Sequence, residues 1–481
     1  MVELIRTVNG AVNDFIWGVP AMVCILGVGL LLSVRTRFLQ IRKFPYAIRT
    51  TLGRMFRKKD AADGAMTPFQ AVCTALAATV GTGNIAGVAG AIAIGGPGAV
   101  FWMWVMALLG MMTSFSENVL GIFYRHKNEE GAWQGGAMYY LADGLGRKKG
   151  CKQLGRVLAV LFAASCVLAS FGMGNMSQIN SIAGNLRAAF GVPELATGVV
   201  LAGCSAAVIF GGLKRVAAVA ERVVPLMALF YLGGALVVVL VHASAVPAAF
   251  AAIFRGAFGL APAGGGVLGC GVARAVTWGF KRGAFSNEAG LGASVMVHSS
   301  SNVTEPVQQG MWGLFEVFAD TLVVCTLTAL VILTSGLVDL ETGRAAAGIV
   351  GSALVGEAFS TVFGSFGPKF IAVSILLFAY STVLGWSQYG TKAVSYLLGP
   401  RAGGAYQALF VGIMVVGAVM KLDLAWDLSD TFNGLMMLPN LVGVAGLSGT
   451  VARITRNYAA RVFYGRDVAP LTASAPRPAR R

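Results

Sequence analysis

Charged residues are scarce in this chain of 481 residues: 12% are Asp, Glu, Lys or Arg, whereas 56% are hydrophobic. A typical soluble domain carries roughly 25% charged residues. The mean hydropathy is correspondingly high, at +0.72. The composition therefore excludes an ordinary soluble domain, and the long apolar runs predict an all-α polytopic membrane protein.

Histidine and cysteine are also sparse, with three and seven residues, and the cysteines show no C-x-x-C spacing. Nearly all the cysteines fall within apolar runs, which favours structural thiols over a metal or redox centre. No nucleophile–base–acid constellation and no phosphate-binding loop stand out. The sequence thus predicts a protein that is not an enzyme and that needs no cofactor.

Apolar runs long enough to cross a bilayer, about 20 residues each, occur eleven times. They lie near residues 12–34, 67–95, 98–124, 157–185, 196–212, 223–243, 266–298, 307–335, 367–392, 404–421 and 430–450. The first run is too long for a signal peptide and lacks a basic segment before it, so we expect a retained helix. Three regions follow: an N-terminal helix and basic linker (1–66), a ten-helix core (67–450) and a basic tail (451–481).

The net charge of +16 does not require a nucleic-acid partner, because the basic residues are distributed asymmetrically. With the N-terminus outside, 28 of the 37 Lys and Arg residues fall in segments on the cytoplasmic side: 35–66, 125–156, 213–222, 392–404 and 450–481. This distribution follows the positive-inside rule. It predicts a multi-pass protein of the plasma (inner) membrane, with the lipid bilayer as a partner, the N-terminus outside and the C-terminus in the cytoplasm.

Two of the apolar runs are interrupted by paired glycines beside polar residues, at Thr79–Asn84 and Phe285–Gly292. Glycine costs about 1 kcal/mol in a helix relative to alanine, and unwound backbone in a membrane needs polar partners. Matching breaks in two halves of a chain are typical of secondary transporters, whose substrate and ions bind there. Glycines that only allow close helix packing explain less well why Thr, Asn or Glu accompanies both breaks.

The ten core spans divide into two sets of five, 67–243 and 266–450, and each set begins with a broken span. In each set a long connection separates the second and third members. Because five is odd, the halves must insert with opposite orientations. The layout predicts a 5+5 inverted repeat with one extra N-terminal helix, eleven transmembrane helices in all.

Several stretches resemble the alanine/glycine:cation symporter family, the sodium–alanine carriers. They are Pro68–Gly87, Gly95–Trp104, Gly135–Tyr140, Lys281–Gly290 and Gly385–Gly390. The resemblance implies a leucine-transporter-like (LeuT-like) fold and cotransport of alanine or glycine with sodium as the coupling ion. Some relatives accept D-alanine or serine.

The same resemblance implies a substrate site at the first break. Val80–Asn84 reproduces the V-G-x-G-N motif of neurotransmitter:sodium symporters, whose freed amides hold the substrate carboxylate; here they belong to Thr82 and Gly83. Helix N-termini favour anions on independent physical grounds. Carbonyls near Thr79 and Phe285 would face the ammonium group, which donates three hydrogen bonds. The other expected substrate residues are Ser286, Asn287, Gln178 and Trp386.

The same resemblance implies a sodium site where the first break meets the run 367–392. Hard cations prefer oxygen ligands, and hydroxyls three and four residues after a carbonyl share a helix face with it. The expected ligands are the carbonyls of Ala77, Val80 and Phe378 and the hydroxyls of Ser381 and Thr382. Both hydroxyls also fit ordinary bonding to the preceding turn. A second cation is assigned to Asn84 and Asp320.

Ionisable residues inside a membrane are costly and usually functional. Glu117 and Glu288 are predicted to support the helix breaks, and Glu316 to reach a neighbouring helix or water. Proton coupling through Asp320 or Glu288 is the alternative within transport. A channel and a sensor that binds amino acid without moving it are the alternatives from other classes.

Overall fold

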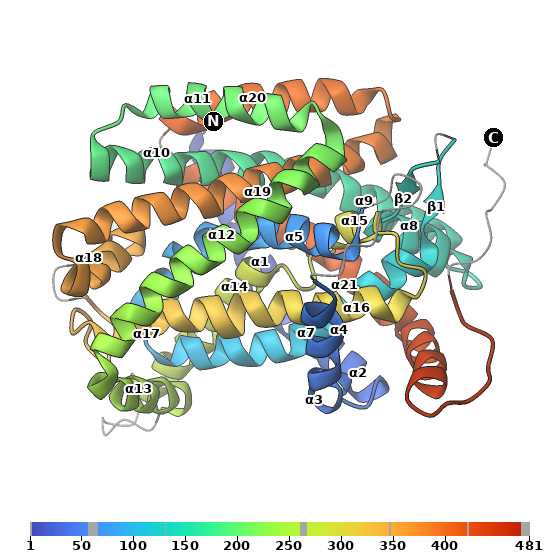
Figure 1. Cartoon of the computed structure of the whole chain (residues 1–481), viewed down its shortest axis with the longest axis horizontal. Helices are drawn as coiled ribbons and strands as arrows, with labels where there is room; N and C mark the ends of the chain where they lie inside the picture. The colour runs from blue at the N-terminus through green and yellow to red at the C-terminus, as the bar shows by residue number, and fades with distance from the viewer. Residues whose placement is uncertain are drawn as a thin grey trace.

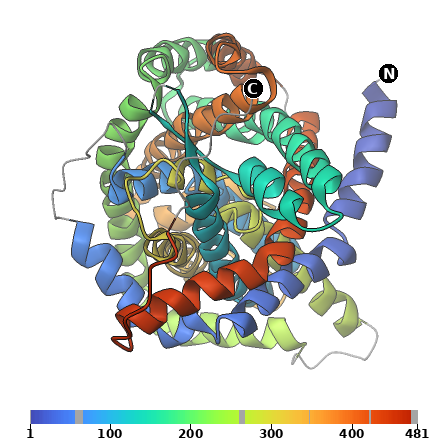
Figure 2. The ribbon, with the colours of Figure 1, turned by 90° about the vertical axis from the view of Figure 1, so that its right-hand side faces the viewer.

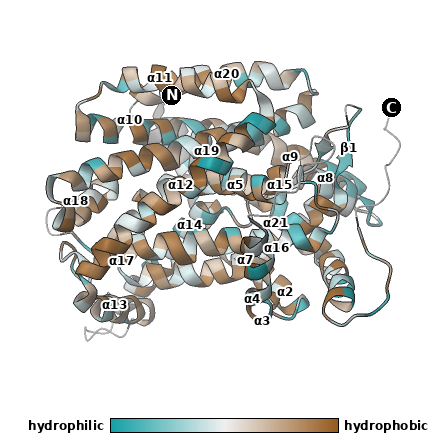
Figure 3. Ribbon diagram, viewed as in Figure 1, coloured by the Kyte–Doolittle hydropathy of each residue, from teal (hydrophilic) through white to brown (hydrophobic). Residues whose placement is uncertain are grey.

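The computed structural model describes residues 2–55, 66–129, 131–259, 267–345, 348–420 and 423–472. These residues are mostly helical, with one antiparallel hairpin of β1 (His126–Lys127) and β2 (Trp133–Gln134). The long helices run roughly along the horizontal of Figure 1, and Figure 3 shows that hydrophobic residues dominate them. The prediction of an all-α polytopic membrane protein is confirmed.

Seven helical stretches among the described residues are long and apolar enough to cross a membrane. Four shorter apolar helices, Pro20–Arg35, Ala86–Gly95, Glu194–Ile209 and Ala243–Phe258, accompany them. A span that is broken at mid-membrane consists of two short helices. A criterion based on helix length therefore does not identify it as a membrane span. The total of eleven spans and the inverted repeat therefore stay predictions.

The N-terminal region differs from the predicted single span 12–34. It contains α1 (Val2–Ile16), α2 (Val19–Arg35), α3 (Leu39–Arg42) and α4 (Phe44–Met55). Two features separate α1 from α2. Gly18 has extended backbone, and Pro20 at the second position of α2 has no N–H to continue a helix. Helix α1 stands at the periphery of the molecule (Figure 2).

The first predicted half is a series of α-helices interrupted by short 3-10 and π-helical segments. It comprises α5 (Pro68–Thr79), η2 (Thr82–Asn84), α6 (Ala86–Gly95), α7 (Gly98–Tyr124), α8 (Ala137–Tyr139), η3 (Tyr140–Gly144), η4 (Leu145–Arg147), α9 (Lys152–Phe171), η5 (Gly172–Met176), α10 (Ser177–Phe190), α11 (Glu194–Ile209) and α12 (Gly212–Val241). Thr67 and Gln70 form a reciprocal capping box that starts α5. A π-helical segment, η5, divides the predicted span 157–185 into α9 and α10.

The second half follows η6 (Ala243–Ala245) and α13 (Val246–Phe258). It comprises α14 (Val267–Asn287), α15 (Val295–His298), α16 (Pro306–Val317), η7 (Phe318–Cys325), α17 (Thr326–Thr334), α18 (Gly351–Phe363), η8 (Gly364–Phe366), α19 (Gly367–Leu398), α20 (Ala402–Val419) and α21 (Asp423–Val462). The part of the tail beyond residue 472 lies outside the described residues.

The second break begins later than predicted. Helix α14 continues through Phe285 and Ser286 to Asn287, and the unwound stretch is 288–294. Its backbone turns at Glu288, Gly290 and Gly292, where φ is 54°, 94° and 72°. Helical backbone has negative φ, so the helix ends at the first of these three residues.

Contacts between helices divide the molecule into two groups that meet at α5. Helix α7 packs against α14 and α16, while α10 packs against α19 and α20, and α11 against α20. Helix α5 contacts α19 in the second group as well as α15 and α16 in the first. The first break therefore lies where the two groups face each other.

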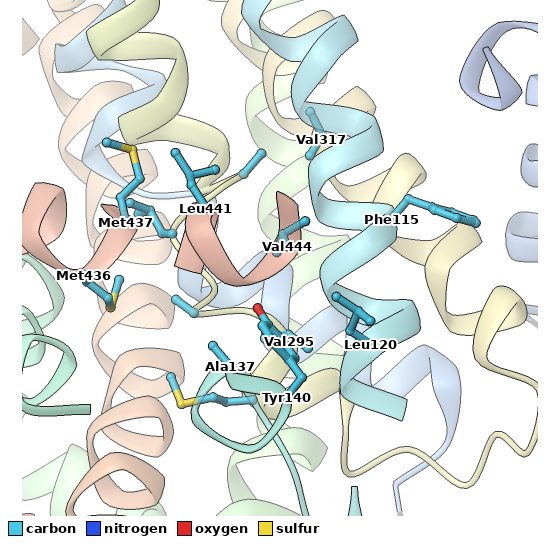
Figure 4. Packing of buried hydrophobic residues seen from close by; sticks show 14 of the residues in the cluster. Phe115, Leu120, Ala137, Tyr140, Val295, Val317, Met436, Met437, Leu441 and Val444 are labelled. Carbon is cyan, nitrogen blue, oxygen red and sulfur yellow. The ribbon is translucent and has the colours of Figure 1, made fainter. Parts of the chain in front are cut away.

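A buried hydrophobic cluster fixes the middle of α21 against the first group. Figure 4 shows Leu441 and Val444 of α21 near Tyr140 and near Val295 of α15. The Tyr140 hydroxyl also donates to the side-chain oxygen of Asn440. Helix α21 thus covers the second break.

The two ends of the molecule carry different connections. The hairpin and α8 lie at the right of Figure 1, whereas α13 and α18 lie at the left. The hairpin segment belongs to the connections predicted to be cytoplasmic, and α13 and α18 to those predicted to be external.

Candidate functional site

The first break frees backbone groups that side chains from elsewhere then satisfy. After Val80 the backbone is extended at Gly81, so the regular helical hydrogen bonds stop. The Gly81 N–H donates to the Asn84 side-chain oxygen at 2.9 Å, inside the break itself. The Thr82 N–H donates to the Gln178 side-chain oxygen at 3.4 Å. The carbonyls that these N–H groups would otherwise bind are released.

Five oxygens from α5 and α19 gather beside this break. The Ser381 hydroxyl lies 3.2 Å from the Ala77 carbonyl oxygen and 2.8 Å from that of Phe378. The Thr382 hydroxyl lies 3.4 Å from the Val80 carbonyl oxygen and 3.0 Å from that of Phe378. All of these residues are buried. The structure therefore brings together the complete set of residues predicted to hold sodium.

Gln178 bridges the first break and the π-helical segment η5. Its amide nitrogen donates to the Met173 carbonyl oxygen at 3.1 Å, while its oxygen accepts from Thr82. The Thr82 hydroxyl is buried and has no hydrogen-bond partner. Thr79 donates to the Ala75 carbonyl of its own helix, so its hydroxyl is already engaged.

The end of α14 lies directly against the first break. A Cβ built on Gly83 would lie 3.3 Å from the Phe285 ring and 3.5 Å from Cα of Ser286. A side chain at position 83 would push against the Phe285 ring, so glycine lets the two segments approach this closely. Five of the predicted substrate residues, Thr82, Gly83, Gln178, Phe285 and Ser286, are thus brought together.

Asp320 of η7 connects the first break to the end of α14. Its carboxylate accepts from the Asn84 amide at 2.7 Å, from the Ser286 hydroxyl at 2.7 Å and from the Thr321 hydroxyl at 2.8 Å. Asp320 is completely buried. The two residues assigned to a second cation are therefore in direct contact.

Asn287 and Trp386 lie outside this contact set. The Asn287 amide is engaged at both ends, because its oxygen accepts from Ala289 N–H at 3.0 Å and its nitrogen donates to the Thr321 hydroxyl at 3.0 Å. The Trp386 indole donates to a Glu288 carboxylate oxygen at 2.9 Å, and its ring is packed against Gly174 of η5. Their substrate roles stay predictions.

Glu117 of α7 lies beneath the second break. Its carboxylate accepts from the N–H groups of Gly290 and Gly292 and from the Asn440 amide. Asn440 also donates to the Gly290 carbonyl oxygen at 2.8 Å. Sequence reasoning missed Asn440, because its contact with the second break depends on tertiary packing. It also missed Cys325, whose sulfur lies 3.2 Å from the Ser286 hydroxyl.

Two basic side chains hold the loop after α15. Arg125 donates to the carbonyl oxygens of Ser299 at 2.9 Å, Ser301 and Val303. Lys392 donates to the Met296 carbonyl oxygen at 2.6 Å. Burial lowers the pKa of Arg125 to about 10, so the guanidinium remains charged at neutral pH.

Arg125→Ala is expected to lower the thermal unfolding midpoint by about 5 °C or more. The substitution leaves three buried carbonyls without their donor, at a cost of about 1–3 kcal/mol each. Thermal unfolding of the purified chain in detergent measures the effect. Arg255→Ala is the control, because that exposed guanidinium bonds only within its own helix. Equal midpoints for the Arg125 variant and wild type would contradict the structural role.

No group of three His, Cys, Asp or Glu residues in the described parts of the chain is arranged to hold a metal ion. The oxygens of the α5–α19 cluster are instead carbonyls and hydroxyls, a set that suits a hard monovalent cation better than a transition metal.

Comparisons with known proteins identify the family. The model of the sodium:alanine symporter family matches residues 2–469. The sodium/alanine symporter AgcS of Methanococcus maripaludis is 41% identical over 456 residues, covering 95% of this chain and 97% of that protein. The probable sodium/glutamine symporter GlnT of Bacillus subtilis is 36% identical, with 97% and 93% coverage.

A further Bacillus subtilis relative, the putative sodium/proton-dependent alanine carrier protein YrbD, is 35% identical over 95% of this chain and 93% of its own. Among solved structures, a manganese transporter of Eremococcus coleocola aligns over 85% of both chains with 12% identity and a TM-score of 0.49. The family match spans nearly the whole chain, and these relatives are named as transporters, not enzymes. This membrane transporter belongs to the sodium:alanine symporter family.

Proposed function

We propose that the protein is a secondary symporter that couples inward sodium movement to uptake of small neutral amino acids, with alanine and glycine first. D-alanine and serine are further candidates. The relatives are named for alanine in two cases and for glutamine in one, so the choice among amino acids belongs to the proposal. The observation that carries it is the cluster of five oxygens beside the first helix break.

The geometry of that cluster supports a sodium site. A hard cation with oxygen ligands at 2.3–2.6 Å keeps neighbouring ligands roughly 3.3–3.7 Å apart at right angles. The contacts between the hydroxyls and the carbonyls are 2.8–3.4 Å, so small outward shifts would admit an ion. The hydroxyls, which donate to the carbonyls without an ion, would turn their hydrogens away and coordinate through oxygen.

The amino acid would bind between the two breaks. Its carboxylate would take the N–H groups of Thr82 and Gly83, displacing the Gln178 oxygen that now accepts from Thr82. A turn of the Gln178 amide would take its nitrogen from the Met173 carbonyl oxygen to the carboxylate. Phe285, whose ring lies against Gly83, would cover the site and limit the size of the substrate side chain.

In the proposed cycle, sodium ties α5 to α19 and so orders the first break for the amino acid. Each ligand must then strengthen the other's binding by the same factor. Alternating access would follow when the group containing α5, α7, α14 and α16 rocks against the group containing α19. The proposal includes a LeuT-like inverted repeat, an inner-membrane location, an external N-terminus, and Glu117 and Glu288 as supports of the breaks.

Uptake of radiolabelled alanine into proteoliposomes tests the proposal. Accumulation with an inward sodium gradient, and none with equimolar choline, is the expected result. Uptake that follows a pH gradient without sodium would favour proton coupling. Absence of alanine counterflow would favour a channel, and binding without uptake would favour a sensor.

Gln178→Ala is expected to raise the alanine KM by about tenfold or more, because a hydrogen bond to a charged group contributes about 1.5–3 kcal/mol. The sodium concentration for half-maximal uptake should change by less than about twofold. Asn180→Ala on the same helix is the control, since its amide bonds to carbonyls at the end of α20. An unchanged alanine KM for Gln178→Ala would remove this residue from the substrate site.

A further inference from the structure

Four carboxylates lie buried around the second break, on three different elements and in the break itself. They are Glu117, Glu288, Glu316 and Asp320. The other three lie close enough to Glu288 to interact with its charge. A buried ionised carboxylate needs hydrogen-bond donors or a counter-ion to offset its lost hydration. The number of donors on each group therefore indicates which of the four holds a negative charge least well.

Two of these carboxylates are supplied with several donors, and a third has a basic partner. Glu117 accepts from two backbone N–H groups and from Asn440. Asp320 accepts from Asn84, Ser286 and Thr321. Glu316 pairs through Oε2 with the imidazole of His298 at 3.1 Å, a partner that can also carry a positive charge, while its Oε1 is buried without a hydrogen-bond partner.

Glu288 has a single donor. One carboxylate oxygen accepts from the Trp386 indole at 2.9 Å, and the other, Oε2, is buried without any hydrogen-bond partner. The residue is held in the left-handed backbone region, with φ of 54°, so the second break keeps this side chain at the contact with α19. Among the described residues, no hydrogen-bond donor and no basic side chain compensates a negative charge on Oε2.

The charged groups that face Glu288 also disfavour a negative charge on it. Glu117 faces it from α7, Glu316 from α16 and Asp320 from η7, and all three are acidic. Cys166 of α9 and Tyr389 of α19 also interact with its charge. Among the described residues, no basic side chain is recorded against it.

Tyr389 supplies a second, independent observation. Its ring lies 5.3 Å from that of Trp386, the donor to Glu288, and its hydroxyl is buried without a hydrogen-bond partner. A carboxylate can only accept, whereas a carboxylic acid carries one O–H donor. The Tyr389 hydroxyl has an O–H of its own, yet it makes no hydrogen bond to Oε2, so this nearby polar group does not offset a charge there.

We propose that Glu288 is a proton-binding site, with the proton on Oε2, and that it is a neutral carboxylic acid in this closed arrangement. The site lies where the second break contacts α19, apart from the five oxygens of the α5–α19 cluster. Loss of the proton would leave an uncompensated charge at a contact between the two helix groups. Closure of this contact is therefore linked to uptake of one proton. The inference is independent of which amino acid or cation is carried.

Infrared spectroscopy of the purified full chain in lipid tests the protonation state. At neutral pH, wild type is expected to show the carbonyl stretching band of a protonated carboxylic acid, and Glu288→Gln to lose intensity in that band. Asp320→Asn is the matched control and should keep the full intensity, because three side-chain donors hold the Asp320 carboxylate. A band that is absent from wild type, or that Glu288→Gln leaves undiminished, would overturn the proposal.

Alanine binding by the same proteins provides a second test. Glutamine reproduces the shape and neutrality of the protonated acid, so Glu288→Gln should bind alanine within about threefold of wild type. Glu288→Asp, which shortens the side chain away from Trp386, should weaken binding by about tenfold or more. If the Gln variant binds as poorly as the Asp variant, or more poorly, a negative charge at position 288 is required and the proposal fails.

Discussion

Thr382→Val should raise the sodium concentration needed for half-maximal alanine uptake by at least about tenfold. Valine keeps the shape of threonine but removes the hydroxyl that lies 3.4 Å from the Val80 carbonyl and 3.0 Å from that of Phe378. A five-oxygen cation site would lose one ligand. The relative rates for alanine, glycine and serine at saturating sodium should stay as in wild type.

Two matched variants separate this effect from a general defect of α19. Thr382→Ser keeps the hydroxyl and should retain sodium half-saturation within about threefold of wild type. Ser374→Ala removes a hydroxyl on the same helix that bonds only to the preceding turn, at the Phe370 carbonyl, and should have no effect. A wild-type sodium dependence in Thr382→Val would mean that the cluster does not bind sodium.

Gly385→Ala should reduce sodium-driven alanine uptake to less than about a tenth of wild type. The added Cβ would lie 2.6 Å from Cβ of Ala78 and 2.9 Å from its Cα and N. These are backbone-level contacts, so α19 and α5 must move apart. Overpacking of this kind typically costs about 1–3 kcal/mol. Gly385 lies one helical turn after Thr382, so moving α19 away from α5 here would also disturb the five-oxygen cluster.

The control for this variant is Gly412→Ala in α20, where an added Cβ meets no atom within 4 Å. Both proteins should elute as single species of the same size, which shows that each has folded. Uptake at increasing sodium then reports the defect, and very high sodium should partly restore the Gly385 variant. Wild-type uptake by Gly385→Ala would contradict the close contact of α5 and α19.

The sequence was sufficient to predict which residues surround the first break. Gly81 and Gly83 in an apolar run signal unwinding, and the i+3 and i+4 spacing of Ser381 and Thr382 after Phe378 follows from helix geometry. That these hydroxyls contact Ala77 and Val80 came from the family resemblance, because single-sequence patterns carry no information about contacts 300 residues apart.

The second break was predicted less well. The motif Phe285–Gly292 marks the region, but the helix continues to Asn287 since its residues up to that point tolerate helical backbone. The helix ends where φ becomes positive, at Glu288, Gly290 and Gly292. Glutamate rarely adopts a positive φ, so Glu288 does not predict this conformation. The role of Asn440, which reaches Gly290 from α21, depends on tertiary packing and has no local signal.

The π-helical segments were also beyond sequence reasoning. Of the three π-helical segments among the described residues, η3, η5 and η7, the last two lie inside long apolar runs. Each of these two carries a residue that contacts a break or its neighbour: the Met173 carbonyl accepts from Gln178, and Asp320 accepts from Asn84. In a π-helix each hydrogen bond spans five residues, compared with four in an α-helix. This difference is too small to alter the hydrophobic periodicity of the sequence.

The measurement that tests the central claim most directly is the alanine affinity of the purified transporter with and without sodium, together with the sodium affinity with and without alanine. If sodium at the α5–α19 cluster orders the first break, each ligand should tighten the other by the same factor, about tenfold or more. Thr382→Val should reduce both factors toward one. Alanine affinity that is the same in sodium and in choline would contradict coupling through this cluster.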